Sequence, residues 1–463
     1  MKFRRFLRYR FDYGRDIHLY LVYILFANIG FGVFTLIFNL YVYALDYRED
    51  TIGVFNSVQT FTMAATAMVL GTLVRRFGLW WAIAGGVAIY GTSGLGLALS
   101  TWAPALTLFS ALAGCGLAVI FTTTMPFIIE YGRYDQRTTV ATVAFSFASL
   151  SMTLGSLVGG FAPLLLSMVI PVVEAGSAAA YRSALIAGSM LGLAALLPLW
   201  RMGEPRRAHR RQLQATGTSA AASGEDTRQT RRDVVVFVLV GLITAVGVGL
   251  VVPFFNVYLQ TLGANPRDIG LIYAMAGLAA AGVGLAAPIV SRRYGSLNAV
   301  LIIRGAPLPF FLLLAVAPWY GLAVVAHVIR QISINMAWPV DSTFISELIP
   351  DRLRASVFGW RSATWNLGIG VSSIFGGWLI VRSGYEATFV GFVLFTAASI
   401  ALYAIYYRQH PRVVAGEIPS ALSSRARGLR AVEGAEREAG TVGGGLPGRA
   451  EAEPREEPIG AAR

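Results

Sequence analysis

The segment 320–345 holds the residues of this sequence that are best suited to do chemistry. It is mostly apolar, yet it contains three ionisable side chains, His327, Arg330 and Asp341. At ~100° per residue, its polar and aromatic side chains fall within an arc of about 140° on one side of a helix. They are His327, Arg330, Gln331, Asn335, Trp338, Asp341 and Ser342. Because such a stripe cannot face lipid, we expect it to face a central cavity or another helix.

The three ionisable groups need different partners. Because an unperturbed histidine titrates near physiological pH, we expect His327 either to carry a proton or to stay neutral in a hydrogen bond to a neighbouring helix. Arg330 lies nearer the middle of the segment and needs a carboxylate, carbonyl groups, water or an anionic solute. Asp341 lies ~16 Å further along the axis, too far to pair with Arg330. It can bridge to Arg304 or to Arg361, which lie in other segments, or it can act in ion coupling.

The apolar segments contain three arginines but only one acid, and this excess of positive charge favours a cavity that accepts an anion. Neutral polar groups on the segments 17–45 and 51–74 either bind a solute or hold helices together. The residues predicted to line a central cavity are Asn28, Asn39, Gln59, His327, Arg330, Gln331, Asn335 and Trp338. The candidates for ion coupling are His327 and Asp341.

The composition excludes most other chemistry. Of the 463 residues, 55% are hydrophobic and 14% are charged, whereas soluble domains carry about 25% charged residues. Lys2 is the only lysine, so no phosphate-binding Gly-Lys-Ser/Thr loop exists. The histidines are scattered and Cys115 is the only cysteine, which leaves no metal-ligand pair or disulfide. We therefore expect a polytopic membrane protein that is not an enzyme and needs no cofactor or metal.

The segments that must position these residues are twelve apolar stretches, each long enough to cross a bilayer core of ~30 Å as a helix. They are 17–45, 51–74, 79–100, 104–129, 139–166, 181–200, 233–261, 268–290, 297–317, 320–345, 355–381 and 385–407. Pro253 predicts a kink in the seventh.

Arginine is concentrated in every second loop, in the middle loop and in both tails. This distribution places both termini on the cytoplasmic side of a plasma membrane. It also explains the net charge of +13 without a nucleic-acid partner.

The two halves of the sequence are repeats related by a shift of 217 residues. Under this shift Phe38-Asn39 aligns with Phe255-Asn256, and Gly159-Gly160 aligns with Gly376-Gly377. We therefore predict an all-α polytopic membrane protein with twelve transmembrane helices in two six-helix pseudo-repeats. The predicted organisation is a basic N-terminal segment 1–16, a first bundle 17–200, a cytoplasmic linker 201–232, a second bundle 233–407 and a disordered tail 408–463.

Two motifs carry a resemblance to a known family. The loop after the second segment reads Gly71-Thr-Leu-Val-Arg75-Arg76-Phe77-Gly78. A glutamate and an arginine with six residues between them follow both the fourth and the tenth segment. On these motifs the chain from about 17 to 407 resembles the major facilitator superfamily (MFS), although Arg75 replaces the aspartate of the family's loop motif. The resemblance implies an MFS-type fold.

The resemblance also implies a cytoplasmic gate of arginines and carboxylates that locks the outward-facing state. Carboxylates at helix ends beside paired arginines suit such a gate, because bidentate contacts of this kind are strong. The alternative is that these charges only set the topology and lie in a solvated face. The predicted gate residues are Arg75, Arg76, Glu130, Arg137, Arg292, Arg293, Glu347 and Arg354.

The function expected from these features is secondary transport of a small organic solute, anionic in the preferred interpretation, by alternating access and driven by a gradient. We expect a monomer in the lipid bilayer, with protons as the candidate coupling ion. Proton-driven multidrug efflux is the first alternative, although the first segment, 17–45, lacks the acid that drug–proton antiporters of the family tend to carry there. A non-transporting membrane sensor or scaffold is the second.

Overall fold

The structure is a computed structural model that describes residues 14–132, 136–169, 174, 176–202, 228–284 and 286–414. Most of the predicted N-terminal segment, the linker from 203 to 227 and the tail from 415 lie outside the described residues.

The first half of the chain folds into six membrane-crossing passes. Its helices are α2 (Arg15–Ala44), α3 (Glu49–Phe77), α4 (Leu79–Leu99), α5 (Ala103–Thr122), α6 (Thr124–Tyr131), α7 (Arg137–Val169), α8 (Ala178–Ala194) and α9 (Leu196–Trp200). Helices α5 and α6 make one bent pass, as do α8 and α9. Long helices are the expected form, because lipid offers no partners for backbone N–H and C=O groups.

The second half repeats this pattern. Its elements are α11 (Arg228–Val251), η2 (Val252–Phe254), α12 (Phe255–Thr261), α13 (Pro266–Gly284), α14 (Ala287–Tyr294), α15 (Ser296–Gly305), α16 (Leu308–Val316), α17 (Tyr320–Leu348), α18 (Asp351–Arg408) and α19 (Pro411–Val414). The kink predicted at Pro253 is confirmed, since a short 3-10 turn separates α11 from α12 there. Helix α18 contains two passes that meet at Gly384, whose φ is 81°.

The passes agree with the predicted count of twelve. Within the described residues, nine stretches are long and apolar enough to cross a membrane. One of them, Ser356–Arg408, contains the turn at Gly384 and so makes two passes. Helix α13 with α14, and helix α17, complete the twelve. Helix α17 is less apolar than the nine stretches because of its polar stripe.

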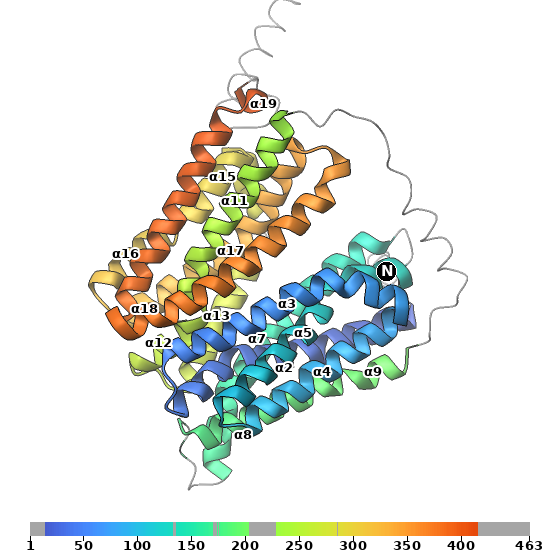
Figure 1. Ribbon diagram of the computed structural model, residues 1–463, viewed down its shortest axis with the longest axis vertical. Coiled ribbons are helices and arrows are strands. Elements are labelled where there is room, and N and C mark those ends of the chain that lie inside the picture. The colour runs from blue at the N-terminus through green and yellow to red at the C-terminus, as the bar shows by residue number, and fades with distance from the viewer. Residues whose placement is uncertain are drawn as a thin grey trace, which may run out of the picture.

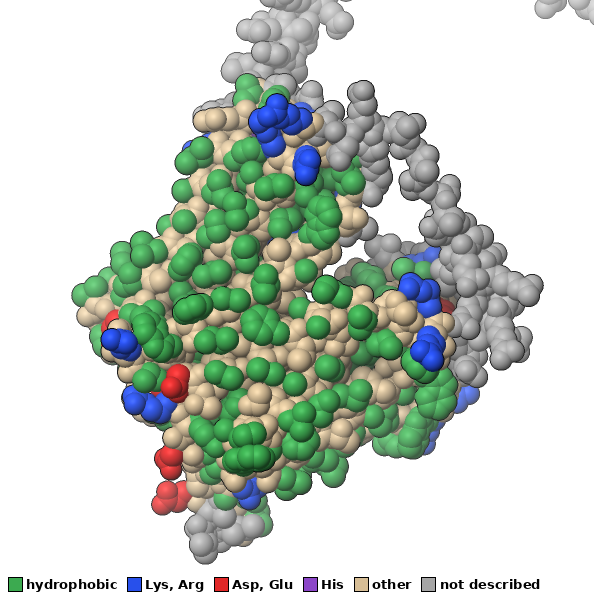
Figure 2. Space-filling view, viewed as in Figure 1, with side chains coloured by type: hydrophobic (Ala, Val, Ile, Leu, Met, Phe, Trp, Pro, Cys, Tyr) green, Lys and Arg blue, Asp and Glu red, His purple; other side chains and the backbone are tan. Residues whose placement is uncertain are grey.

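Helices α2–α9 and α11–α19 form two bundles. Figure 1 shows them against each other at one end and diverging toward the end where the N-terminus and α19 lie. At the closed end α3 packs on α18 and α7 packs on α13, so each bundle contributes one helix to each seam. Charged side chains gather at the ends of the bundles, and hydrophobic side chains cover the surface between them (Figure 2).

The contacts at the closed end repeat the 217-residue shift. Asn39 Nδ2 donates to the carbonyl of Pro253 at 2.5 Å, and Asn256 Nδ2 donates to the carbonyl of Leu36 at 2.8 Å. Each bond is the other moved by 217 residues. Glycines follow the same rule. A Cβ on Gly160 would lie 2.8 Å from the carbonyl oxygen of Pro266, and a Cβ on Gly377 would clash with the carbonyl oxygen of Glu49. These positions need glycine because backbones meet there.

The open end has its own matched pairs. Helices α3 and α14 stop at Gly78 and Gly295, whose φ values of 92° and 80° suit glycine. Arg137 donates from Nε to the carbonyl of Gly132 and from Nη2 to that of Ile129. Arg354 makes the same two bonds to Ile349 and Ser346. Each arginine thus caps the end of the pass before it, where carbonyl groups lack helical partners.

The second bundle begins earlier than predicted. Helix α11 starts at Arg228, inside the expected linker 201–232. Asp233 explains the extension, since its buried carboxylate accepts from Tyr406 at 2.8 Å and from Gln229 at 3.2 Å and faces His410 at 3.3 Å. The end of α18 and the short α19 are held by the same carboxylate, so the helical region also continues past the predicted end at 407.

Candidate functional site

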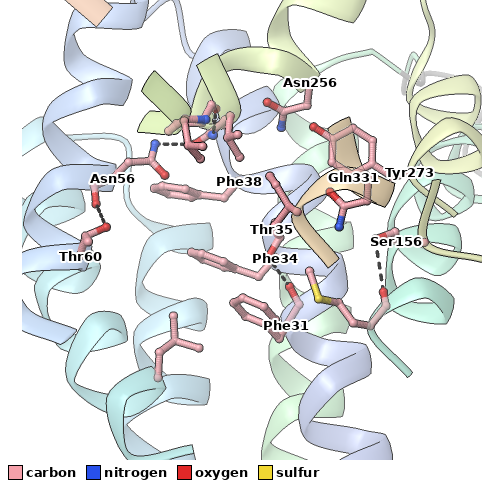
Figure 3. Close-up of a pocket in the computed structure, with 18 of the residues that line it drawn as sticks. Phe31, Phe34, Thr35, Phe38, Asn56, Thr60, Ser156, Asn256, Tyr273 and Gln331 are labelled. Carbon is pink, nitrogen blue, oxygen red and sulfur yellow. Dashed lines mark hydrogen bonds between the residues drawn. The ribbon is translucent and has the colours of Figure 1, made fainter. Parts of the chain in front are cut away.

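A cavity of about 520 Å³ lies between the two bundles. It is lined by α2, α3, α5 and α7 on one side and by α11 to α13, α17 and α18 on the other. The reciprocal bonds of Asn39 and Asn256 lie at its wall, toward the end where the bundles meet. Figure 3 shows this cavity with residues of both bundles facing it.

The wall from the first bundle combines phenylalanine rings with uncharged polar side chains. Phe31, Phe34 and Phe38 project from successive turns of α2 (Figure 3), and Phe34 stacks on Phe38 with 4.9 Å between ring centroids. Hydroxyl groups on this wall donate to carbonyls of their own helices, as Thr35 does to Phe31. None of the described residues that this bundle contributes to the wall is charged. The wall can therefore contact a flat apolar body.

The wall from the second bundle is polar and cationic. His327 and Arg330 are 1% and 3% exposed, and Arg330 Nη2 lies 3.2 Å from His327 Nδ1. Because a guanidinium only donates, His327 Nδ1 accepts and the imidazole is neutral with its proton on Nε2. The imidazole packs between the rings of Phe255 and Tyr273, at 5.1 and 4.3 Å. Arg330 is the cationic group among the described residues that line this cavity.

The structure places most of the predicted cavity residues in this lining. Asn39, Gln59, His327, Arg330, Gln331 and Asn335 line it. Asn28 does not appear in its lining: the side chain is buried and Nδ2 donates to the carbonyl of Ile24 one turn earlier, at 2.9 Å. The sequence placed Asn28 and Asn39 on the same helix face and could not show which of them lines the cavity. Asn28 is therefore not part of the candidate site.

Trp338 lines a second cavity of about 420 Å³ inside the second bundle, among α11, α15, α17 and α18. The two cavities share Arg330 and Asn335. Beside the second cavity lies a buried ion cluster. Asp341 Oδ2 bonds to Arg304 Nη2 at 2.5 Å and to Arg361 Nη2, so the acid bridges to both arginines and not to one alone.

The predicted gate residues lie at the open end. Arg75 Nη2 donates to Thr72 at 2.9 Å, Arg76 lies over the ring of Phe77, and Arg293 lies over that of Tyr294. Arg137 and Arg354 cap helix ends as described above. Glu130 is half-buried near the end of α6, and the side chains of Arg292 and Glu347 lie outside the described part of the chain. The carboxylate–arginine contacts of the gate stay a prediction.

Sequence reasoning missed two polar bonds across the seam of α3 and α18. Tyr385 donates to Glu49 Oε1 at 2.8 Å, and Ser57 Oγ lies 2.5 Å from the carbonyl of Gly370. Glu49 is only 8% exposed although it opens its helix. The sequence did not single it out, because it lies at the start of an apolar segment beside Arg48 and Asp50.

Comparison with known proteins identifies the scaffold. A family model described as "Major Facilitator Superfamily" matches residues 19–334 and 308–436. The chain is 29% identical over 136 residues to the Quinolone resistance protein NorA of Staphylococcus aureus. That match covers 29% of this chain and 34% of the relative, so the chain spans about a third of the curated relatives it matches.

Solved structures agree on the fold. The nucleoside transporter NupG aligns with a TM-score of 0.66 at 16% identity, over 85% of this chain and 98% of its own. The D-xylose-proton symporter aligns with a TM-score of 0.66 at 14% identity, over 88% of this chain and 99% of its own. At these identities the likeness shows the fold alone.

Proposed function

Since the chain belongs to the major facilitator superfamily and is a multi-pass membrane transporter rather than an enzyme, we propose that it moves a small amphipathic organic anion by alternating access. The solute would be an aromatic or otherwise flat carboxylate. Transport would be driven by a gradient, with the chain acting as a monomer in a plasma membrane.

The observation that carries this proposal is the contrast between the two walls of the central cavity. One wall offers phenylalanine rings without charge, and the other offers Arg330 beside a neutral histidine. A buried arginine without a carboxylate costs several kcal/mol unless water or a ligand compensates it. A carboxylate bound there gains a charge-assisted, bidentate contact, and its apolar body covers the opposite wall.

The orientation follows from arginine in the loops. We infer that both termini are cytoplasmic, so the diverging end of Figure 1 faces the cytoplasm and the glycine seams close the outer side. The gate of Glu130, Glu347 and the loop arginines would then assemble when the molecule turns outward.

We assign proton coupling to His327, with Asp341 as the second candidate. A proton on His327 would place two positive charges 3.2 Å apart in a buried site, which is unfavourable until an anion arrives. Anion and proton would therefore bind together, which corresponds to symport.

Efflux of aromatic drugs is the alternative, and the similarity to a quinolone resistance protein favours it. The aromatic wall suits such compounds. A membrane sensor or scaffold is a third hypothesis, which any substrate-dependent flux would remove.

Flux into proteoliposomes tests the proposal. Labelled benzoate should enter on a proton gradient faster than neutral benzamide of the same shape. Arg330→Lys should keep part of the flux because the charge remains, and Arg330→Gln should lose nearly all of it. Arg382→Gln, which removes an arginine that lies over Trp378, is the matched control and should transport normally.

Wild-type benzoate flux in Arg330→Gln would show that the solute is not held by this charge. Flux of an uncharged or cationic aromatic compound in place of benzoate would move the efflux alternative ahead.

A further inference from the structure

We propose that the second cavity is a binding site for a small oxyanion, such as a sulfate, phosphate or carboxylate group, held by Arg304, Arg330 and Arg361. This site shares Arg330 with the central cavity but does not include the phenylalanine rings of its opposite wall. The proposal goes beyond the proposed solute and does not depend on that solute's identity.

The three guanidinium groups are built into the bundle interior. Arg304, Arg330 and Arg361 are 5%, 3% and 3% exposed, and all three line the cavity. Rings cover their faces: Arg361 lies 4.3 Å from the ring centroid of Phe237 and 5.1 Å from that of Trp338. Arg304 lies 5.3 Å from the ring centroid of Tyr403. With their faces covered, these groups can bind a further partner only through their N–H edges.

Asp341 leaves part of those edges unused. Both arginines bond to the same oxygen, Oδ2, through their Nη2 atoms. Arg304 Nη1, Arg361 Nε and Arg330 Nε are buried and have no hydrogen-bond partner. Buried charged donors without acceptors are costly, so a site of this kind draws in a ligand that accepts several bonds.

The local charge points the same way. Three arginines line the cavity and Asp341 neutralises one of them, which leaves two positive charges. Among the described residues that line the two cavities, none carries a negative charge. An oxyanion supplies one or two negative charges and offers oxygens that fit the guanidinium fork.

The six-pass fold itself does not require the cluster, because the first bundle forms without it. In the first bundle the positions 217 residues earlier hold Val87, Ala113, Thr124 and Ala144 in place of Arg304, Arg330, Asp341 and Arg361. The same six-pass bundle therefore forms with small or apolar side chains at all four positions.

Asp341 acts in this arrangement as a built-in competitor. Its carboxylate occupies guanidinium edges that an incoming oxyanion would use. Removing its charge should make a bound oxyanion tighter, whereas an acid that only supports the fold has no such effect on a ligand.

The test is sulfate binding to the purified full chain in nanodiscs of neutral phosphatidylcholine, measured by calorimetric titration and by the unfolding temperature. Sodium chloride at the same ionic strength is the reference. We expect saturable sulfate binding that is lost in Arg361→Gln and about tenfold tighter in Asp341→Asn. Arg382→Gln at the surface should bind sulfate as the wild type does.

Because Asp341→Asn removes the only acid of the cluster, a double variant keeps the test decisive. Arg304→Gln with Asp341→Asn removes one charge of each sign, and it should bind sulfate within about threefold of the wild type. The proposal is overturned if chloride and sulfate have the same effect, or if Arg361→Gln binds sulfate normally. It is also overturned if folded Asp341→Asn binds sulfate no more tightly than the wild type and the double variant no longer binds sulfate. Benzoate transport without sulfate binding would reject this site alone, and sulfate binding without benzoate transport would reject the proposed solute alone.

Discussion

The two bundles share a framework but not a chemistry. At the closed end Asn39 and Asn256 make reciprocal bonds, and at the open end Arg137 and Arg354 make identical caps. Inside the bundles the symmetry stops. The second bundle buries Arg304, Arg330, Arg361 and Asp341 where the first has small or apolar residues. The repeat thus fixes how the halves meet, while among the described residues that line the two cavities only those of the second bundle are charged.

The largest expected effect separates the halves most clearly. Asp341→Asn leaves Arg304 and Arg361 without their shared carboxylate, and should lower stability by about 3–5 kcal/mol. Thr124→Ala, at the matching position of the first bundle, should cost less than about 1 kcal/mol. Unfolding temperatures of the two variants in the same detergent measure the difference. Equal losses would show that the charge cluster is not special.

The next effect tests the division of labour across the central cavity. Phe31→Ala removes one of the phenylalanine rings from the wall of the first bundle and should raise the KM for an aromatic acid about tenfold, which corresponds to ~1.4 kcal/mol. The KM for a short aliphatic acid should change little, because such a solute does not reach the ring. Uptake measured with both acids decides this. A common rise in both KM values would point to a distorted cavity.

The seam offers a test of equivalence. Asn39→Leu and Asn256→Leu each remove one of the reciprocal bonds, and each should shift the conformational balance toward the outward-facing state by about 1 kcal/mol. Spin labels at the exposed positions 48 and 382, one on each bundle, report the distance between the bundles at the closed end. A shift in only one of the two variants would break the symmetry of the seam.

The smallest effect is expected at the helix caps. Arg137→Lys and Arg354→Lys lose the forked contact to two carbonyl groups while keeping the charge. Each should lower stability by about 0.5–1 kcal/mol, and the two losses should be alike. Thermal unfolding measures both. A much larger loss in one bundle would reveal a further role for that arginine.

Much of the fold was predictable because polar residues and glycines, which are uncommon in lipid-facing positions, recur at matching positions in the two halves. Polar and glycine positions such as Asn39 with Asn256 hold one register, and Pro253 marks its kink in the sequence. The polar stripe of 320–345 predicted where a cavity should lie, and His327, Arg330 and Asn335 do line one.

The contacts between side chains of different helices could not be predicted, because they depend on how the helices are rotated and packed relative to one another. That Asp341 meets both Arg304 and Arg361 requires three helices to converge, and periodicity gives each helix only its own faces. Asn28 shows the reverse case, since it satisfies its amide within its own helix. Asp233 and His410 sit at segment ends, where sequence boundaries are least certain, so their bond could not be foreseen.

The reciprocal bonds of Asn39 and Asn256 constrain how this sequence can evolve. Each amide meets a carbonyl three residues before the other amide's own position, so the bonds exist only while both halves keep the same count from Leu36 to Asn39 and from Pro253 to Asn256. One inserted residue would rotate the following side chains by ~100° and withdraw both contacts at once. Along these stretches natural variants should therefore keep both asparagines and should not change length.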